Sequence, residues 1–291
     1  MKYTFTIIAL FCVSLVFGQE VDPRVFKDTK IINSVSIETL EKRKLDFRVG
    51  HKFGDLAGDS GGWQTFYGLE NASDVMIGFD YGLTDKWMIG INRTKGSDEL
   101  KQNINLSTKL RLADSRSGGN FPFTITVFGM ASISSMPKSK SSEPSLSAFT
   151  NSVHRIVYHM QIMAGHKIAN RLSLQANAGF TYRNVVREGD KNDLVSLGFA
   201  LKYQFTKSFA LIGEGIFPFN GARDLQTETN PIYFPSTGVA LEWETGGGHT
   251  FQINLTNARG LVATDYVPNN TSDWSDGEFR MGFIISRLFT L

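Results

Sequence analysis

The sequence is poor in cysteine: Cys12 is the only one in 291 residues. It lies within residues 1–18, which have the order of a secretory signal, with Lys2 at the start, an apolar centre at Ile7–Phe17 and small Gly18 at the exit. A buried N-terminal strand and a lipoprotein cleaved before Cys12 are the alternatives, but the second leaves a very short apolar stretch. Removing this signal peptide excludes disulfides and cysteine-based metal sites from the mature chain.

Net charge and long apolar runs are also scarce. The formal net charge is +2, and it falls to +1 when Lys2 leaves with the signal, so we expect no nucleic-acid partner. Beyond the N-terminus there is no run of about 18 apolar residues, and we therefore expect no membrane-spanning helix. The chain has 8 prolines but 28 glycines and 23 phenylalanines, a composition that suits β-structure with many turns.

Residues 74–93 set the pattern for the rest of the chain. They form two runs in which apolar residues alternate with small or polar ones, joined by a short turn at residues 83–86. Strict alternation predicts a strand whose two faces meet different surroundings. A soluble sheet buries its apolar face in a core, whereas a membrane barrel turns that face to lipid and its polar face to the lumen.

The same alternation recurs to the carboxyl end and predicts about twelve wall strands. Their expected ranges are 45–53, 74–82, 87–93, 101–112, 121–133, 153–168, 172–183, 195–205, 209–217, 237–244, 250–257 and 279–291. Long and very short connections alternate between them, as in outer-membrane barrels. We therefore predict an all-β fold, a single antiparallel transmembrane β-barrel over residues 45–291, in the outer membrane of a Gram-negative bacterium. Residues 19–44 are expected to be a periplasmic segment or a plug.

Aromatic and charged residues take different faces of these strands. Aromatic residues beside the short turns are expected to form a girdle in the headgroup layer: Tyr81, Trp87, Tyr203, Phe209, Trp243 and Phe251. Ionisable residues on the polar face are expected to line the lumen: Arg48, Lys52, Asp80, Lys109, Arg111, Arg155, His159, Lys202, Glu214, Glu242 and Glu244. In an open lumen such charges select small polar solutes. In a closed one they pair across the lumen, and a barrel of about twelve strands is narrow enough for side chains and a plug to fill.

Three segments resemble a known family. VFKDTKIINSVSIETLEKRKLDFRVGHKFG at residues 25–54, FDYGLTDKWMIGINR at 79–93 and FRMGFIISRLF at 279–289 resemble Bacteroidota outer-membrane β-barrels catalogued as a domain of unknown function. The resemblance covers the whole mature chain, and the first segment is its most specific part. It implies a fold and a location, but it carries no catalytic residues to this sequence.

The sequence favours passage or binding of small polar solutes, without catalysis, metal or cofactor. The acidic run at residues 273–278 lacks the spacing of a calcium loop. The main alternative is an accessory barrel that docks a protein partner through residues 54–72, 134–151 or 19–44. A hydrolase using His159 or Glu242 is a third hypothesis, although no G-x-S-x-G motif is present. Expected partners are outer-membrane lipid and, through the last strand, the barrel assembly machinery.

Overall fold

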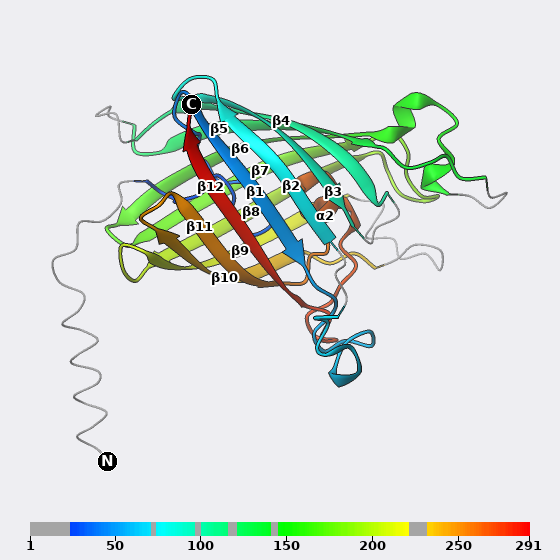
Figure 1. The fold of residues 1–291 in the computed structure, drawn as a ribbon. Coiled ribbons are helices and arrows are strands. Elements are labelled where there is room, and N and C mark those ends of the chain that lie inside the picture. The colour runs from blue at the N-terminus through cyan, green and yellow to red at the C-terminus, as the bar shows by residue number, and fades with distance from the viewer. Residues whose placement is uncertain (1–23, 71–73, 97–99, 116–120, 141–144, 221–231) are drawn as a thin grey trace, which may run out of the picture.

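The described residues of the computed structural model, 24–70, 74–96, 100–115, 121–140, 145–220 and 232–291, form a closed barrel of twelve antiparallel strands (Figure 1). The predicted signal lies outside these ranges. The strands are β1 (Lys44–Lys52), β2 (Asp74–Gly82), β3 (Trp87–Lys95), β4 (Gln102–Ala113), β5 (Thr124–Ser134), β6 (Ile156–Ala169), β7 (Leu172–Arg183), β8 (Asp193–Gln204), β9 (Phe209–Phe219), β10 (Ser236–Thr245), β11 (His249–Thr256) and β12 (Arg280–Thr290). Short helices are η1 (Trp63–Thr65), η2 (Leu146–Ala148), η3 (Ser152–Arg155) and α2 (Ala263–Asn269). None of the described helices has the length and apolar character needed to cross a bilayer.

Each strand pairs with its neighbours in the sequence, and β1 pairs with β12 to close the ring, from Lys44 opposite Thr290 to Lys52 opposite Gly282. We call the rim with the short turns, where β1 begins and β12 ends, the inner rim, and the opposite one the outer rim. The long connections lie at the outer rim. The β4–β5 connection, residues 114–123, is the exception, because it lies at the inner rim without being a short turn.

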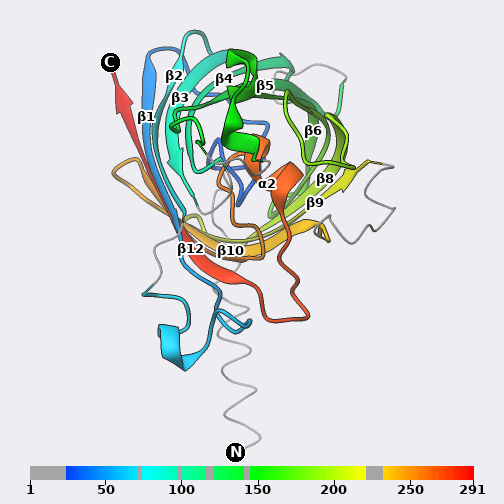
Figure 2. The same ribbon diagram turned by 90° about the vertical axis from the view of Figure 1, so that its right-hand side faces the viewer.

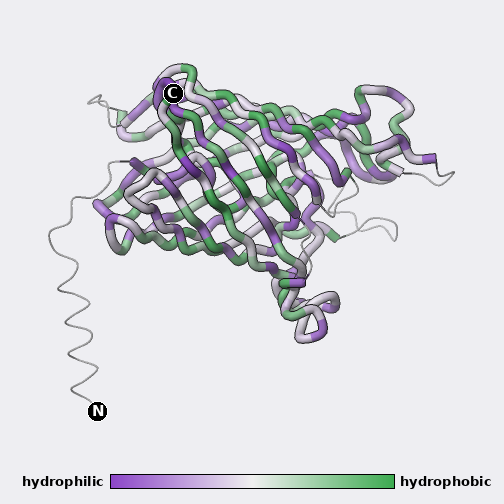
Figure 3. The backbone as a smooth tube through the Cα atoms, in the orientation of Figure 1, coloured by the Kyte–Doolittle hydropathy of each residue, from purple (hydrophilic) through white to green (hydrophobic). Residues whose placement is uncertain are grey.

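The wall is apolar on the outside and polar on the inside, which confirms the predicted fold. Phe79, Leu106 and Leu241 point outward and are 47%, 46% and 42% exposed. Lys109 and Glu242 point inward and are 2% and 1% exposed. Hydropathy alternates along each strand accordingly (Figure 3). Such an outer surface is stable in acyl chains rather than in water, because burial from water is what favours apolar side chains.

The lumen is filled by two segments from opposite rims (Figure 2). Residues 24–40, which we call the plug hairpin, precede β1. Residues 258–270, which we call the inner loop, include α2 and fold inward from the outer rim. Their apolar side chains pack together and against inward methionines and phenylalanine of the wall. This lumen core comprises Val25, Phe26, Ile31, Ile32, Ile37, Met76, Phe128, Met130, Met163, Ala200, Ile212, Ala240, Leu261 and Val262.

Candidate functional site in the lumen

The plug hairpin runs from the inner rim toward the outer half of the lumen and back. Lys30 and Val35 form an antiparallel bridge, and the Ile31 amide donates to the Ser34 carbonyl at 2.9 Å. Residues 31–34 are therefore a tight turn, the hairpin tip. So short a hairpin is not stable by itself in water. Its conformation depends on the groups that the wall presents to its backbone.

Glu214 of β9 holds the hairpin tip. Its carboxylate accepts hydrogen bonds from the amides of Asn33 at 2.5 Å and of Ile32 and Ser34 at 3.3 Å, and from the Ser34 hydroxyl at 2.8 Å. Three successive amides converging on one anion form a nest for negative charge. Because hydrogen bonds to an ionised acceptor are the strong ones, Glu214 is a principal anchor of the plug hairpin.

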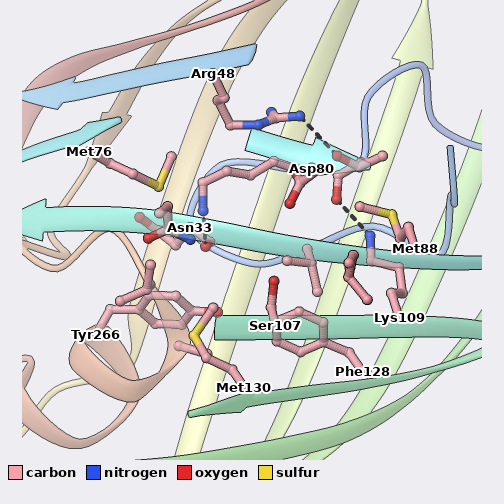
Figure 4. A pocket seen from close by; sticks show the side chains of 17 residues that line it. Asn33, Arg48, Met76, Asp80, Met88, Ser107, Lys109, Phe128, Met130 and Tyr266 are labelled. Atoms are coloured by element: carbon pink, nitrogen blue, oxygen red, sulfur yellow. Dashed lines mark hydrogen bonds between the residues drawn. The ribbon is translucent and has the colours of Figure 1, made fainter. Parts of the chain in front are cut away.

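Lys109 and Arg48 hold the middle of the hairpin (Figure 4). Lys109 Nζ donates to the carbonyls of Thr29, Ser36 and Glu38 at 2.8–2.9 Å, using all three ammonium protons. Arg48 forms a bidentate pair with Asp28, at 2.8 and 2.5 Å. Burial opposes ionisation of Asp28, but the Arg48 guanidinium outweighs it and holds the pKa of Asp28 below its usual value.

Two lysines join the hairpin tip to the inner loop. Lys52 Nζ donates to Asn33 Oδ1 at 2.6 Å and to the carbonyls of Ala258 and Gly260 at 2.9 and 2.6 Å. Lys30 Nζ donates to the carbonyls of Asn33 and Leu261 at 2.7 and 2.9 Å. Burial lowers the pKa of Lys30 to about 8, and the Glu214 carboxylate opposes that drop. The two lumen segments thus form one polar junction.

The wall also has a shape that fits the hairpin. At Gly165 of β6, an added Cβ would lie 2.6 Å from Ile37 Cδ1, so the absence of a side chain there makes the recess that Ile37 fills. Gln175 of β7 accepts from the Ile37 amide at 2.8 Å and donates to the Val35 carbonyl at 3.0 Å. This combination of an apolar recess and backbone hydrogen bonds defines the register of the hairpin in the lumen.

The other residues predicted to line the lumen lie as follows. His159 lies between Thr181 at 2.8 Å and Gln161 at 3.2 Å, so both ring nitrogens have a partner. Lys202 Nζ lies 5.7 Å from the ring centre of Phe26, and Glu242 is buried nearby in β10. Asp80, labelled in Figure 4, points into the lumen from β2.

Three predicted lumen residues lie nearer the rims. Glu244 pairs with Lys27 at 3.0 Å at the inner rim, and Arg111 pairs with Asp114 at 2.8 Å and with Glu38 at 3.6 Å. Arg155 is not on the wall. It ends η3 at the outer rim, donates to the carbonyls of Ser134 and Met136 and stacks 4.0 Å from the Phe149 ring centre.

The aromatic residues predicted for the girdle point outward at the inner rim. Trp87, Tyr203 and Phe209 are exposed, Trp87 Nε1 donates to Thr108 at 2.9 Å, and Trp243 stacks on Phe251 at 5.3 Å. Tyr81, also at this rim, is half-buried. A second set beside the outer rim was not predicted, because those residues adjoin long connections: Tyr158, Tyr182, Phe217 and Phe219.

Sequence reasoning also missed the inner loop and the roles of Asp28, Lys30 and Asn33. The available signal was residues 25–37, where apolar pairs alternate with charged and polar residues in a segment too short for a separate domain. Among the described residues, no group of three or more His, Asp or Glu side chains is placed to hold a metal ion. That statement includes the acidic run at residues 273–278.

Several cavities adjoin the plugged lumen. One of about 60 Å³ lies between the hairpin and the β1–β5 wall, room for a few water molecules (Figure 4). Another, of about 170 Å³, lies at the inner rim between the hairpin and the wall, with Lys27 and Glu244 in its lining. A further cavity, of about 190 Å³, lies at the outer rim above the inner loop and is lined by Arg183, Arg187, Tyr233, Asp265 and Asn269, among others. We call it the outer vestibule. Its mixed polar lining can hydrogen-bond a small polar molecule.

The barrel is similar to those of several solved porins and channels. They include the KdgM porin in complex with disordered oligogalacturonate, 10% identical, covering 84% of this chain and 99% of that one with a TM-score of 0.49. The NanC porin is 9% identical, covering 84% and 99%, with a TM-score of 0.48. An outer membrane channel from Pseudomonas putida F1 is 14% identical, covering 93% and 100%, with a TM-score of 0.49. No curated protein matches the sequence significantly.

A family model described as a membrane bound beta barrel domain (DUF5777) matches residues 26–289, which include the plug hairpin and nearly all of the barrel. Together with the apolar outer wall, this match confirms the predicted location: the protein is a membrane β-barrel of the kind found in Gram-negative outer membranes. The family part of the predicted resemblance is confirmed as well. The chain belongs to the DUF5777 family of membrane-bound β-barrel domains.

Proposed function

We propose that this barrel binds and passes small polar solutes, without catalysis, and that the plug hairpin closes it at rest. The observation that carries the proposal is the way the hairpin is held. Lys109 and Glu214 bind its backbone, and Lys52 binds its Asn33 side chain, through hydrogen bonds and charge, and water or a polar solute can replace such contacts. A lumen whose only role was structural is more simply filled by apolar side chains, because buried charges are costly unless they are fully paired.

The outer vestibule is where the proposed solute first binds. It offers hydrogen-bonding side chains around a space of about 190 Å³, bounded below by the inner loop. The inner loop in turn contacts the hairpin tip through Lys52 and Lys30. A solute that displaces the inner loop therefore weakens two of the contacts that hold the hairpin. This connection gives binding at the outer rim a direct route to opening.

The test is conductance in planar bilayers. We expect the native protein to show little conductance and a variant lacking residues 24–40 to conduct steadily. Altered mobility of unheated protein on a denaturing gel checks that both barrels are folded. A folded deletion variant that conducts no more than a protein-free bilayer would contradict the proposal. A stoichiometric protein partner recovered in mild detergent would then favour the accessory barrel.

We also propose that the protein comes from a member of the Bacteroidota, which the resemblance of residues 25–54 and 279–289 supports.

A further inference from the structure

The loop between β1 and β2 carries three exposed aromatic side chains. Trp63, Phe66 and Tyr67 are 74%, 50% and 48% exposed. Their rings gather into one group, with ring centres 6.0 Å apart for Trp63 and Phe66 and 6.3 Å for Trp63 and Tyr67. We call them the loop aromatics. A contiguous apolar patch on a protein surface marks a contact site, because large aromatic surfaces are unfavourable in water.

The loop that carries them is anchored to the barrel. Asp55 pairs with Arg280 of β12, and the Leu56 amide donates to the Phe279 carbonyl at 2.7 Å. Phe66 and Tyr67 have φ angles of 48° and 55°, a left-handed conformation that residues with a Cβ rarely adopt. Two of the three rings are thus carried by successive residues in an uncommon backbone conformation, and both remain exposed.

The position of the loop indicates what it meets. In both views it lies at the outer rim and outside the circumference of the barrel, beside β12 and β1 (Figures 1 and 2). In a membrane, that place is the lipid surface next to the wall. The wall below continues the aromatic character, since Phe53 and Phe283 lie 6.2 Å apart between ring centres at the outer ends of β1 and β12.

We propose that the loop aromatics lie in the headgroup layer of the outer leaflet and anchor the barrel to the lipid surface. Tryptophan and tyrosine favour this layer, where the ring meets acyl chains and the polar edge reaches water or headgroups. Residues 54–70 contain no lysine or arginine, so the contact depends on rings rather than on basic charge. The occupant is lipid because the loop lies outside the ring, beside the membrane-facing wall at the outer ends of β1 and β12 (Figures 1 and 2).

Quenching of Trp63 fluorescence tests the proposal. The full chain with Trp87, Trp243 and Trp274 replaced by phenylalanine keeps Trp63 as its only tryptophan. In nanodiscs, we expect lipids brominated near the headgroup to quench Trp63 strongly and lipids brominated deep in the acyl chain to quench it little. Acrylamide should quench it less than in urea-unfolded protein. Replacing Phe66 and Tyr67 by alanine should increase the quenching by acrylamide. A matched variant that retains only Trp87 serves as a reference for a tryptophan in the aromatic girdle at the inner rim.

Equal acrylamide quenching in folded and unfolded protein, with no effect of bromine at either depth, would overturn the proposal. So would protection of Trp63 that persists in lipid-free detergent together with cross-links between two copies, because that result identifies a second chain as the partner. If the triple replacement does not fold, a spin label at Gln64→Cys in Cys12→Ser protein gives the same answer. Its collision rate with oxygen should exceed that of a label at Lys138→Cys, and equal rates would contradict lipid contact.

Discussion

Replacing Glu214 by alanine should release the plug hairpin while leaving the barrel folded. The substitution removes the acceptor of three tip amides and one hydroxyl. An unsatisfied buried donor costs about 1–3 kcal/mol, and water entering the vacated space recovers part of that cost. We therefore expect docking of the hairpin to weaken by about 3–5 kcal/mol. That change corresponds to a population of the undocked hairpin at least about a hundred times larger.

Hydrogen exchange measured by mass spectrometry resolves this change by segment. In Glu214→Ala, peptides from residues 24–40 should exchange at least about a hundred times faster, whereas peptides from β6–β8 should keep their protection. Glu244→Gln is the matched control, because that carboxylate pairs with Lys27 at the rim and is 32% exposed, where an ion pair contributes about 0–1 kcal/mol. Unchanged exchange of residues 24–40 in Glu214→Ala would refute the role assigned to the carboxylate. Faster exchange in every strand would show general destabilisation instead.

Three further changes test the plug and the wall. Gly165→Val should weaken hairpin docking by about 1–3 kcal/mol, because overpacking displaces Ile37 from its recess. Gly129→Val, on the outward face of the wall, is the control. Equal hydrogen exchange of the hairpin in the two variants would contradict the prediction. Lys30 has a pKa of about 8 when docked and 10.5 when released, so its charge opposes docking below pH 8 and ceases to do so as the pH rises to 10.5. Conductance of the native protein should therefore fall across pH 8–10.5. In Lys30→Met this fall should be smaller, because the contribution of Lys30 to the docking free energy, about 3 kcal/mol, is absent. Identical pH profiles of the two proteins would rule out this role of Lys30. Phe199→Arg in the middle of β8 should destabilise the barrel in vesicles by about 2–4 kcal/mol, against about 0–1 for Phe219→Arg at the outer rim, and equal urea midpoints would contradict the membrane depth assigned to the two positions.

The barrel wall was predictable because its signal is local and repeated. A strand has a period of two, so residues such as Phe79, Leu106 and Leu241 reveal its outward face directly. One hairpin is compatible with a soluble core, but repetition to the carboxyl end, with short turns at one rim, indicates a membrane barrel. Arg155 shows the limit. Alternation continues through residues 153–155, yet the Asn151 side chain accepts from the Val153 amide at 3.2 Å and favours a helical turn there.

The contents of the lumen were much harder to predict. Lys109 and Glu214 read as lumen charges, but their partners are backbone groups of residues 29–38, and sequence does not show which carbonyl or amide a side chain will meet. The inner loop has no periodicity, and its burial depends on closure of a ring whose ends, β1 and β12, are far apart in sequence. Its clearest sign was a short apolar run, Leu261-Val262-Ala263, in an otherwise polar connection.

The hairpin is joined to β1 by residues 41–43, and both of its ends lie at the inner rim. Once β1 and β12 have paired, a continuous hydrogen-bonded ring encloses the hairpin. The connection from the hairpin to β1 is too short for the hairpin to pass through the opposite opening of the barrel. It must enter before that seam forms, or thread in afterwards from the side of its tether. Withdrawal has the same direction, so opening of the proposed kind would move the hairpin toward the compartment that the inner rim faces.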